Sequence, residues 1–202
     1  MAFRDWSAGS AALRPAEDDL DAAVAHLNAA VLDGTDQVDV RDRILDFIAT
    51  HPDALHRTCL DGHLTGSGVV VDPATGESLL INHVKLGRWL QPGGHADGDG
   101  NLASVAWREA TEETGLNGLQ AVLPAIDVDI HEIPARPGEP AHLHLDLRFL
   151  ILVGTDREAA PNHETLGARW MRPDDPEIAG GGELHRVVSR ACALATERFG
   201  AD

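Results

Sequence analysis

The chain has 202 residues, 43% of them hydrophobic, which suits one domain with an extension and is enough for a real core. Its formal net charge of −17 argues against a nucleic-acid polymer or an anionic membrane surface as a partner, because phosphate repulsion would go unbalanced. Cys59 and Cys192 are the only cysteines and lie far apart, which excludes a disulfide framework and favours a reducing compartment. Because no apolar run could span a bilayer and the start carries no signal pattern, we expect a cytoplasmic protein.

The first part of the chain, residues 1–61, is expected to form a helical extension. After an irregular lead over residues 1–15, an apolar stripe from Leu20 to Val31 predicts a helix that ends at Gly34. A second helix is expected over residues 40–50. We expect these helices to pack on the domain that follows. The alternatives are a lid over a substrate or an arm that forms a homodimer.

The rest of the chain, residues 62–199, is expected to form the main domain, with strands on both sides of a central helix. Val-rich and alternating segments predict strands over residues 64–72, 77–84, 120–134, 142–153 and 166–171. Turn residues at 73–76 make the first two a hairpin, and residues 184–199 predict a closing amphipathic helix. This order predicts an α/β fold in which a mixed sheet is covered on both faces.

The central helix follows a glycine-rich loop, GHADGDG at 94–100, and reads NLASVAWREATEETGL at 101–116. With 3.6 residues per turn, Glu109, Glu112 and Glu113 continue the apolar stripe of the same helix face. Converging carboxylates repel each other unless cations lie between them, and hard oxygen ligands suit Mg²⁺ or Mn²⁺. The pattern therefore predicts a metal site on this helix, and Gly115 is expected to end the helix in a left-handed conformation.

This spacing resembles the Nudix box, the signature of hydrolases that cut nucleoside diphosphates linked to another group. Counted from Gly94, the family pattern matches Arg108, Glu109, Glu112, Glu113, Gly115 and Leu116. Two further segments, DIHEIPAR at 129–136 and AHLHLDLRF at 141–149, look like parts of an uncharacterised bacterial subgroup. The resemblance implies an α/β/α sandwich, a Mg²⁺ or Mn²⁺ cofactor and a small nucleotide-type substrate. It also implies that Glu109, Glu112 and Glu113 hold the metal, with a backbone oxygen at Gly93 or Gly94.

The sequence departs from the family pattern at Gly100, where the family has its first glutamate. Asp97 and Asp99 are the candidates to supply a nearby carboxylate instead. Because the missing residue is not one of the clustered glutamates, we expect metal binding to survive. Gly100→Glu is expected to preserve or raise activity, unless the loop has a geometry of its own.

The candidate catalytic residues are Arg108, Glu109 and Glu112. Arg108 lies four positions before Glu112, so an i, i+4 pair can orient the carboxylates. One carboxylate must accept a proton from the attacking water, and we assign this role to Glu109. Glu164, in a later loop, is the alternative base and a candidate substrate contact.

Four histidines form a second signal. His142 and His144 share one face of an expected strand, His131 lies on the strand before it, and His95 follows the box glycine. We expect them to line the cleft as candidate substrate-binding residues. Three interpretations stay open: unrelated polar positions, protonated contacts to phosphate, or a separate transition-metal site of neutral imidazoles. Arg148 is a further candidate for a phosphate contact.

The expected function is hydrolysis of a diphosphate bond by water attack on phosphorus. The first alternative is a nucleotide sensor on the same fold, which the departure at Gly100 favours and the intact glutamates oppose. The second is an isomerase acting on an allylic diphosphate, which the lack of a cysteine beside the box opposes.

Overall fold

The computed structural model describes residues 3–7, 9–84, 87–160, 165–180 and 182–200. Its strands are β1 (Arg4–Trp6), β2 (Gly62–Asp72), β3 (Glu77–His83), β4 (Arg88–Leu90), β5 (Gly93–His95), β6 (Gln120–Ile133), β7 (His142–Leu152) and β8 (Thr165–Met171). Its helices are the short 3-10 turn η1 (Ala11–Leu13) and α1 (Leu20–Ala29), α2 (Gly34–Thr50), α3 (Leu102–Thr114) and α4 (Gly182–Phe199).

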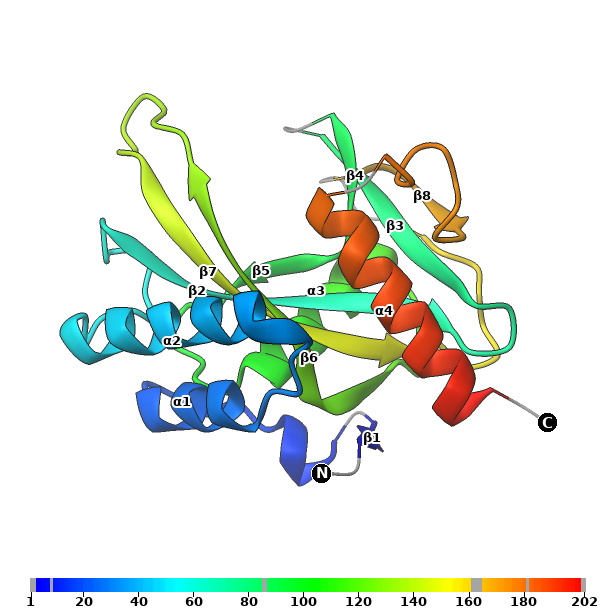
Figure 1. The fold of residues 1–202 in the computed structure, drawn as a ribbon, viewed down its shortest axis with the longest axis horizontal. Helices are drawn as coiled ribbons and strands as arrows, with labels where there is room; N and C mark the ends of the chain where they lie inside the picture. Colours follow the sequence, from blue (N-terminus) through cyan, green and yellow to red (C-terminus); the bar gives the residue numbers. More distant parts are fainter. Residues whose placement is uncertain (1–2, 8, 85–86, 161–164, 181, 201–202) are drawn as a thin grey trace.

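The strands form one mixed sheet with helices on both faces (Figure 1). The order is β1-β6-β7-β2-β3-β4, with β5 paired to β2 and β8 paired to β3. The pair β2–β7 is parallel, and the other pairs are antiparallel. The predicted α/β sandwich with a mixed sheet is therefore confirmed.

Strand β2 lies at the centre of the sheet and contributes to the cores on both faces. Its side chains alternate, so that Leu64 and Val70 pack with α3 whereas Val69 and Val71 pack with α4. Helix α3 lies unusually close to the strand at two glycines. An added Cβ would lie 2.7 Å from the Leu102 carbonyl oxygen at Gly66, and 3.0 Å from that of Ala106 at Gly68. This close approach fixes the position of the motif helix on the sheet.

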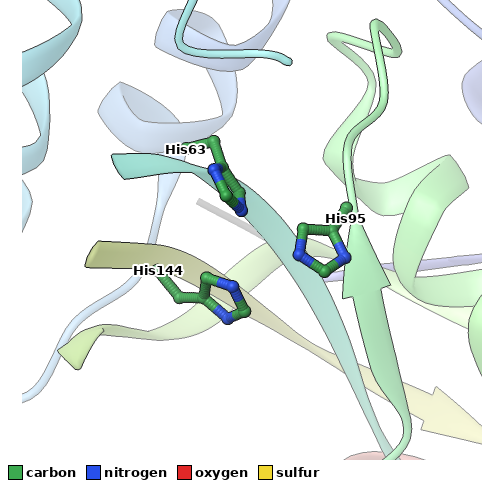
Figure 2. A group of neighbouring side chains, drawn as sticks. All are labelled: His63, His95 and His144. Carbon is green, nitrogen blue, oxygen red and sulfur yellow. The ribbon is translucent and has the colours of Figure 1, made fainter. Parts of the chain in front are cut away.

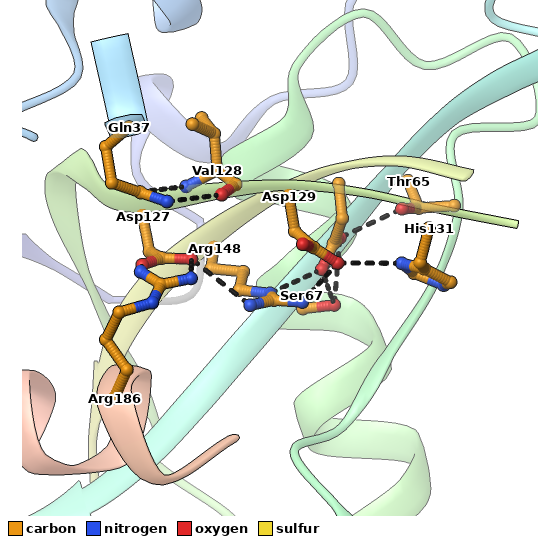
Figure 3. Close-up of polar contacts among 10 residues, drawn as sticks. Gln37, Thr65, Ser67, Asp127, Val128, Asp129, His131, Arg148 and Arg186 are labelled. Carbon is orange, nitrogen blue, oxygen red and sulfur yellow. Dashed lines mark hydrogen bonds and ion pairs between the residues drawn. The ribbon is translucent and has the colours of Figure 1, made fainter. Parts of the chain in front are cut away.

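The N-terminal segment packs on the sheet and shares its core, as expected for the extension. Leu13, Leu27 and Ile44 belong to the same buried cluster as the α3 face of the sheet. The Gln37 side chain on α2 donates to the Val128 carbonyl at 3.0 Å and accepts from its amide at 3.1 Å (Figure 3). These contacts attach α2 to the backbone of β6.

Two expectations for this segment are wrong. Gly34 begins α2 rather than ending the first helix, because α1 stops at Ala29 and the Val31 amide donates to the Ala125 carbonyl of the sheet at 3.0 Å. The lead over residues 1–15 is not wholly irregular, since β1 pairs with β6. Both features depend on contacts with distant strands. None of the described helices is long and apolar enough to cross a membrane.

Candidate functional site

Helix α3 is capped at both ends. The Asn101 side chain accepts from the Ser104 amide at 3.2 Å and donates to the carbonyls of Ala12 and Arg14 at 2.9 Å each. At the other end, Gly115 adopts φ 69°, so its predicted left-handed conformation is confirmed. The start of the motif helix is therefore attached to the N-terminal segment.

The glutamates of α3 face the glycine strand β5 to different extents. The Glu109 carboxylate lies against Gly94, where an added Cβ would be 2.5 Å from the carboxyl carbon and 2.7 Å from both oxygens. Buried Glu113 accepts a hydrogen bond from the Gly93 amide at 2.9 Å. Glu112 is exposed. The three carboxylates do not form one compact group, as expected for like charges without a cation between them.

Arg108 does not form the expected pair with Glu112. Its guanidinium pairs with neighbouring Glu109 at 2.9 Å and donates to the His95 carbonyl at 3.4 Å. The i, i+4 expectation is wrong because the side chain turns toward β5. Arg108 therefore orients the carboxylate that lies against Gly94.

Gly100 is required by the N-terminal segment. An added Cβ would overlap with the carbonyl oxygen of Asp19, so the structure has no room for a glutamate here and favours the alternative that the loop has a geometry of its own. The activity of Gly100→Glu stays a prediction. The nearby acids are also engaged. Both oxygens of Asp97 accept from Arg57 at 2.7 Å, and Asp99 accepts from the Ala16 amide at 2.8 Å.

Five histidines gather at one end of the sheet. The register places His131 opposite His144 on β6 and β7, His63 opposite His144 on β2, and His95 on β5 opposite Thr65. Neighbouring ring centroids are 4.8–5.3 Å apart, and His142 completes the group. The structure thus brings the four predicted histidines together and adds His63. The alternation of His63, Thr65 and Ser67 on β2 was the signal that could have revealed it.

At three of these histidines, His63, His95 and His144, burial favours the neutral imidazole. Burial, together with the neighbouring histidines, lowers the pKa of His144 to about 2. Burial and the charge of Arg57 lower the pKa of His95 to about 4, and burial also lowers that of His63. Protonated contacts from His95 or His144 to phosphate are therefore disfavoured near neutral pH.

A network of buried charged side chains adjoins the histidine cluster (Figure 3). Arg148 pairs with Asp129 at 2.8 Å, with Asp146 at 2.9 Å and with Asp127 at 3.2 Å, and Arg186 of α4 also contacts Asp127. Burial disfavours the charge of Arg148, but the three aspartates hold its pKa above the usual range. Arg148 is therefore a structural residue, and its buried ion pairs argue against it as a candidate phosphate contact.

The network also reaches the histidines. Asp146 accepts from the hydroxyls of Thr65 and Ser67 at 2.9 Å. Asp129 lies 2.9 Å from Nδ1 of His131, and this hydrogen bond with the charge of Arg148 outweighs burial and lowers the pKa of Asp129. The remaining site candidate, Glu164, lies outside the described residues.

Comparison with known proteins agrees with this fold. Residues 62–192 match the family model of the NUDIX domain. Among solved structures, an Ap4A hydrolase of C. elegans in a binary complex is 19% identical with a TM-score of 0.53, over 67% of this chain and 98% of that chain. The dihydroneopterin triphosphate pyrophosphohydrolase of E. coli is 16% identical with a TM-score of 0.50, over 63% and 92%. At these identities the two structures support the fold. The family match spans more than half of the chain, and its members are hydrolases of phosphorus-containing anhydrides that generally use divalent metal ions. The chain therefore belongs to the Nudix family.

Proposed function

We propose that this protein hydrolyses the diphosphate linkage of a small nucleoside diphosphate-X metabolite with Mg²⁺ or Mn²⁺. Residues 62–199 form the catalytic domain in this proposal, and residues 1–61 are an extension that supports it. The observation that carries the proposal is the placement of the Glu109 carboxylate directly against the backbone of Gly94.

The residues around Gly94 suit a hard divalent cation. A Cβ at position 94 would lie 2.5 Å from the carboxyl carbon of Glu109, so a larger residue there would displace this carboxylate. Glu109, Glu112, Glu113 and the carbonyl oxygen of Gly94 are the ligands we assign, all of them oxygen donors. A bound divalent ion supplies charge neutralisation on the phosphates and lowers the pKa of a bound water.

The side chains around the proposed metal site have separate roles in the reaction. Glu109 accepts the proton of the attacking water, and Arg108 holds its carboxylate in place through the 2.9 Å contact. Glu112 is exposed on the same helix, and we assign it as a further ligand of the ion. His95 on β5, His131 on β6, and His142 and His144 at the start of β7 are the side chains that we assign to border the substrate.

A sensor without turnover is the second candidate, and Gly100 is the observation that favours it. The space that the side chain of the first box glutamate would need is occupied by the backbone of the N-terminal segment. The isomerase alternative has less support. Cys59 and Cys192 are buried, and burial raises the pKa of both thiols, that of Cys192 to about 12.

The test compares Glu112→Gln with Glu132→Gln, an exposed glutamate on β6 far from the motif in sequence. Turnover of a nucleotide-type substrate in Mg²⁺ should fall by about 100-fold or more in Glu112→Gln and stay near wild type in Glu132→Gln, while both keep the circular dichroism of the wild type. Equal turnover of the two variants would contradict the metal-site assignment.

A further inference from the structure

Three of the clustered histidines project from different strands toward one space (Figure 2). They are His63 on β2, His95 on β5 and His144 on β7, and one ring nitrogen of each lies within 4.8 Å of the other two. Within the described part of the chain, this is the one group of three or more histidine, cysteine or acidic side chains close enough to share an ion.

The buried His63 points to a missing ligand. Its side chain is only 3% exposed, and its Nδ1 lies 3.5 Å from the Cys59 carbonyl oxygen. A carbonyl only accepts, so Nδ1 carries the proton and Nε2 keeps its lone pair. That Nε2 is buried and has no hydrogen-bond partner among the described residues. A buried acceptor of this kind calls for a donor or a cation.

We propose that His63, His95 and His144 bind a transition-metal ion, with Zn²⁺ as the best match. Neutral imidazole nitrogens suit borderline metals, whereas Mg²⁺ and Mn²⁺ prefer oxygen. Four-coordinate zinc at about 2.0–2.1 Å from each nitrogen places the ligand nitrogens roughly 3.4 Å apart. The observed spacing is within 4.8 Å, so the ring nitrogens would have to approach one another by about 1.4 Å at most on binding the ion.

The surroundings have the supporting contacts that metal sites use. A ligating histidine commonly donates a hydrogen bond from its second ring nitrogen to a backbone carbonyl, as Nδ1 of His63 does to Cys59. Two further histidines surround the group: Nδ1 of His142 lies 2.9 Å from the Pro140 carbonyl oxygen, and His131 is held by Asp129. The cationic side chain of Arg57 is already paired with Asp97, which offsets its repulsion of a divalent ion.

The proposed zinc site and the site of the α3 glutamates are separate, but residues of strand β5 contribute to both. Gly94 lies against Glu109, and the next residue, His95, presents its imidazole to the histidine group. The two sites use different donors, oxygen in one and nitrogen in the other. They are therefore expected to select different ions from a mixture.

The experiment measures Zn²⁺ binding by the full-length, tag-free chain after removal of metals with a chelator. Titration calorimetry is done in excess Mg²⁺, so that the carboxylates are not available to zinc. The wild type, Glu112→Gln and the control His185→Gln, a histidine on α4, should each take up one equivalent of Zn²⁺. His63→Gln and His144→Gln should bind more weakly by over 100-fold, since loss of a supporting contact alone costs roughly 10- to 100-fold.

Three results would overturn the proposal: no zinc uptake by the wild type, unchanged affinity in the two histidine variants, or loss of zinc binding in Glu112→Gln. If a histidine variant unfolds, the visible absorption of Co²⁺ bound to the wild type tests the proposal instead. Intense visible absorption from a four-coordinate site with nitrogen ligands supports the proposal, and the weak bands of six-coordinate cobalt contradict it. Neither readout requires catalytic turnover.

Discussion

Gly100→Ala tests why this chain lacks the first glutamate of its family motif. The added methyl group would overlap with the carbonyl oxygen of Asp19, which belongs to the backbone and cannot rotate away. The N-terminal segment must therefore shift from the loop before α3. Three hydrogen bonds join residues 16–18 to residues 98–100: Gly100 amide to Ala16 carbonyl at 2.8 Å, Ala16 amide to Asp99 at 2.8 Å, and Asp18 amide to Gly98 carbonyl at 2.7 Å.

The loss of these three hydrogen bonds determines the expected decrease in the free energy of unfolding. At about 1 kcal/mol for each of the three, the free energy of unfolding should fall by about 3 kcal/mol. The measurement is urea unfolding followed by circular dichroism, with unchanged m values. Gly180→Ala is the matched control, because a Cβ there meets nothing within 4 Å and its backbone needs no left-handed conformation. Its effect should stay within about 0.5 kcal/mol.

The reasoning is refuted if Gly100→Ala unfolds at the same urea concentration as Gly180→Ala. That result would mean that the N-terminal segment moves aside without cost. Gly100→Glu would then be a reasonable restoration of the family motif. If Gly100→Ala is destabilised as calculated, the glycine is explained by packing, and the motif of this chain is adapted to its extension.

Further predictions concern the buried polar groups. Arg148→Met should lower the free energy of unfolding by about 3–5 kcal/mol, because buried Asp129 and Asp146 lose the Arg148 cation and Asp127 is left with Arg186. Arg41→Met, which breaks a pair with exposed Asp42, should cost about 1 kcal/mol or less. Equal losses in urea unfolding would argue against the network. Burial lowers the pKa of His26, so below about pH 6.5 the unfolded chain binds the proton that the folded chain resists, and stability falls as the solution is acidified. His26→Phe should therefore show a smaller fall between about pH 7 and pH 5 than the wild type, and parallel pH profiles would contradict this assignment.

Much of the fold follows from local patterns in the sequence. The long alternating segments of β2, β3, β6 and β7 and the periodic helices α3 and α4 lie close to their predicted ranges, because each pattern is repeated over several residues. The left-handed Gly115 follows from the motif itself. The short strands β1, β4 and β5 were not predicted, since three residues carry no period and form only where a partner strand lies.

The site was predictable where chemistry is concentrated in one segment and less so where it is assembled from several. Glu109 and Glu113 lie on one helix, and both reach β5. The alternation of polar residues on β2 places His63 on a polar face, but only the parallel pairing of β2 with β7 brings it to the other histidines, and the sequence does not predict this pairing. Arg148 resembles a surface charge in the sequence and is buried because three aspartates from two strands surround it.

The most direct test of the proposed function is a substrate panel with the wild type and Glu112→Gln. Nucleoside triphosphates, nucleotide sugars, ADP-ribose, dinucleotides and coenzyme A are each incubated with Mg²⁺ or Mn²⁺, and products are identified by mass spectrometry. We predict cleavage of one class at a diphosphate bond, lost on addition of a chelator and strongly reduced in Glu112→Gln. Measurable binding of a nucleotide without any product would contradict hydrolysis and leave the sensor, and turnover that is unchanged in Glu112→Gln would contradict the assigned site.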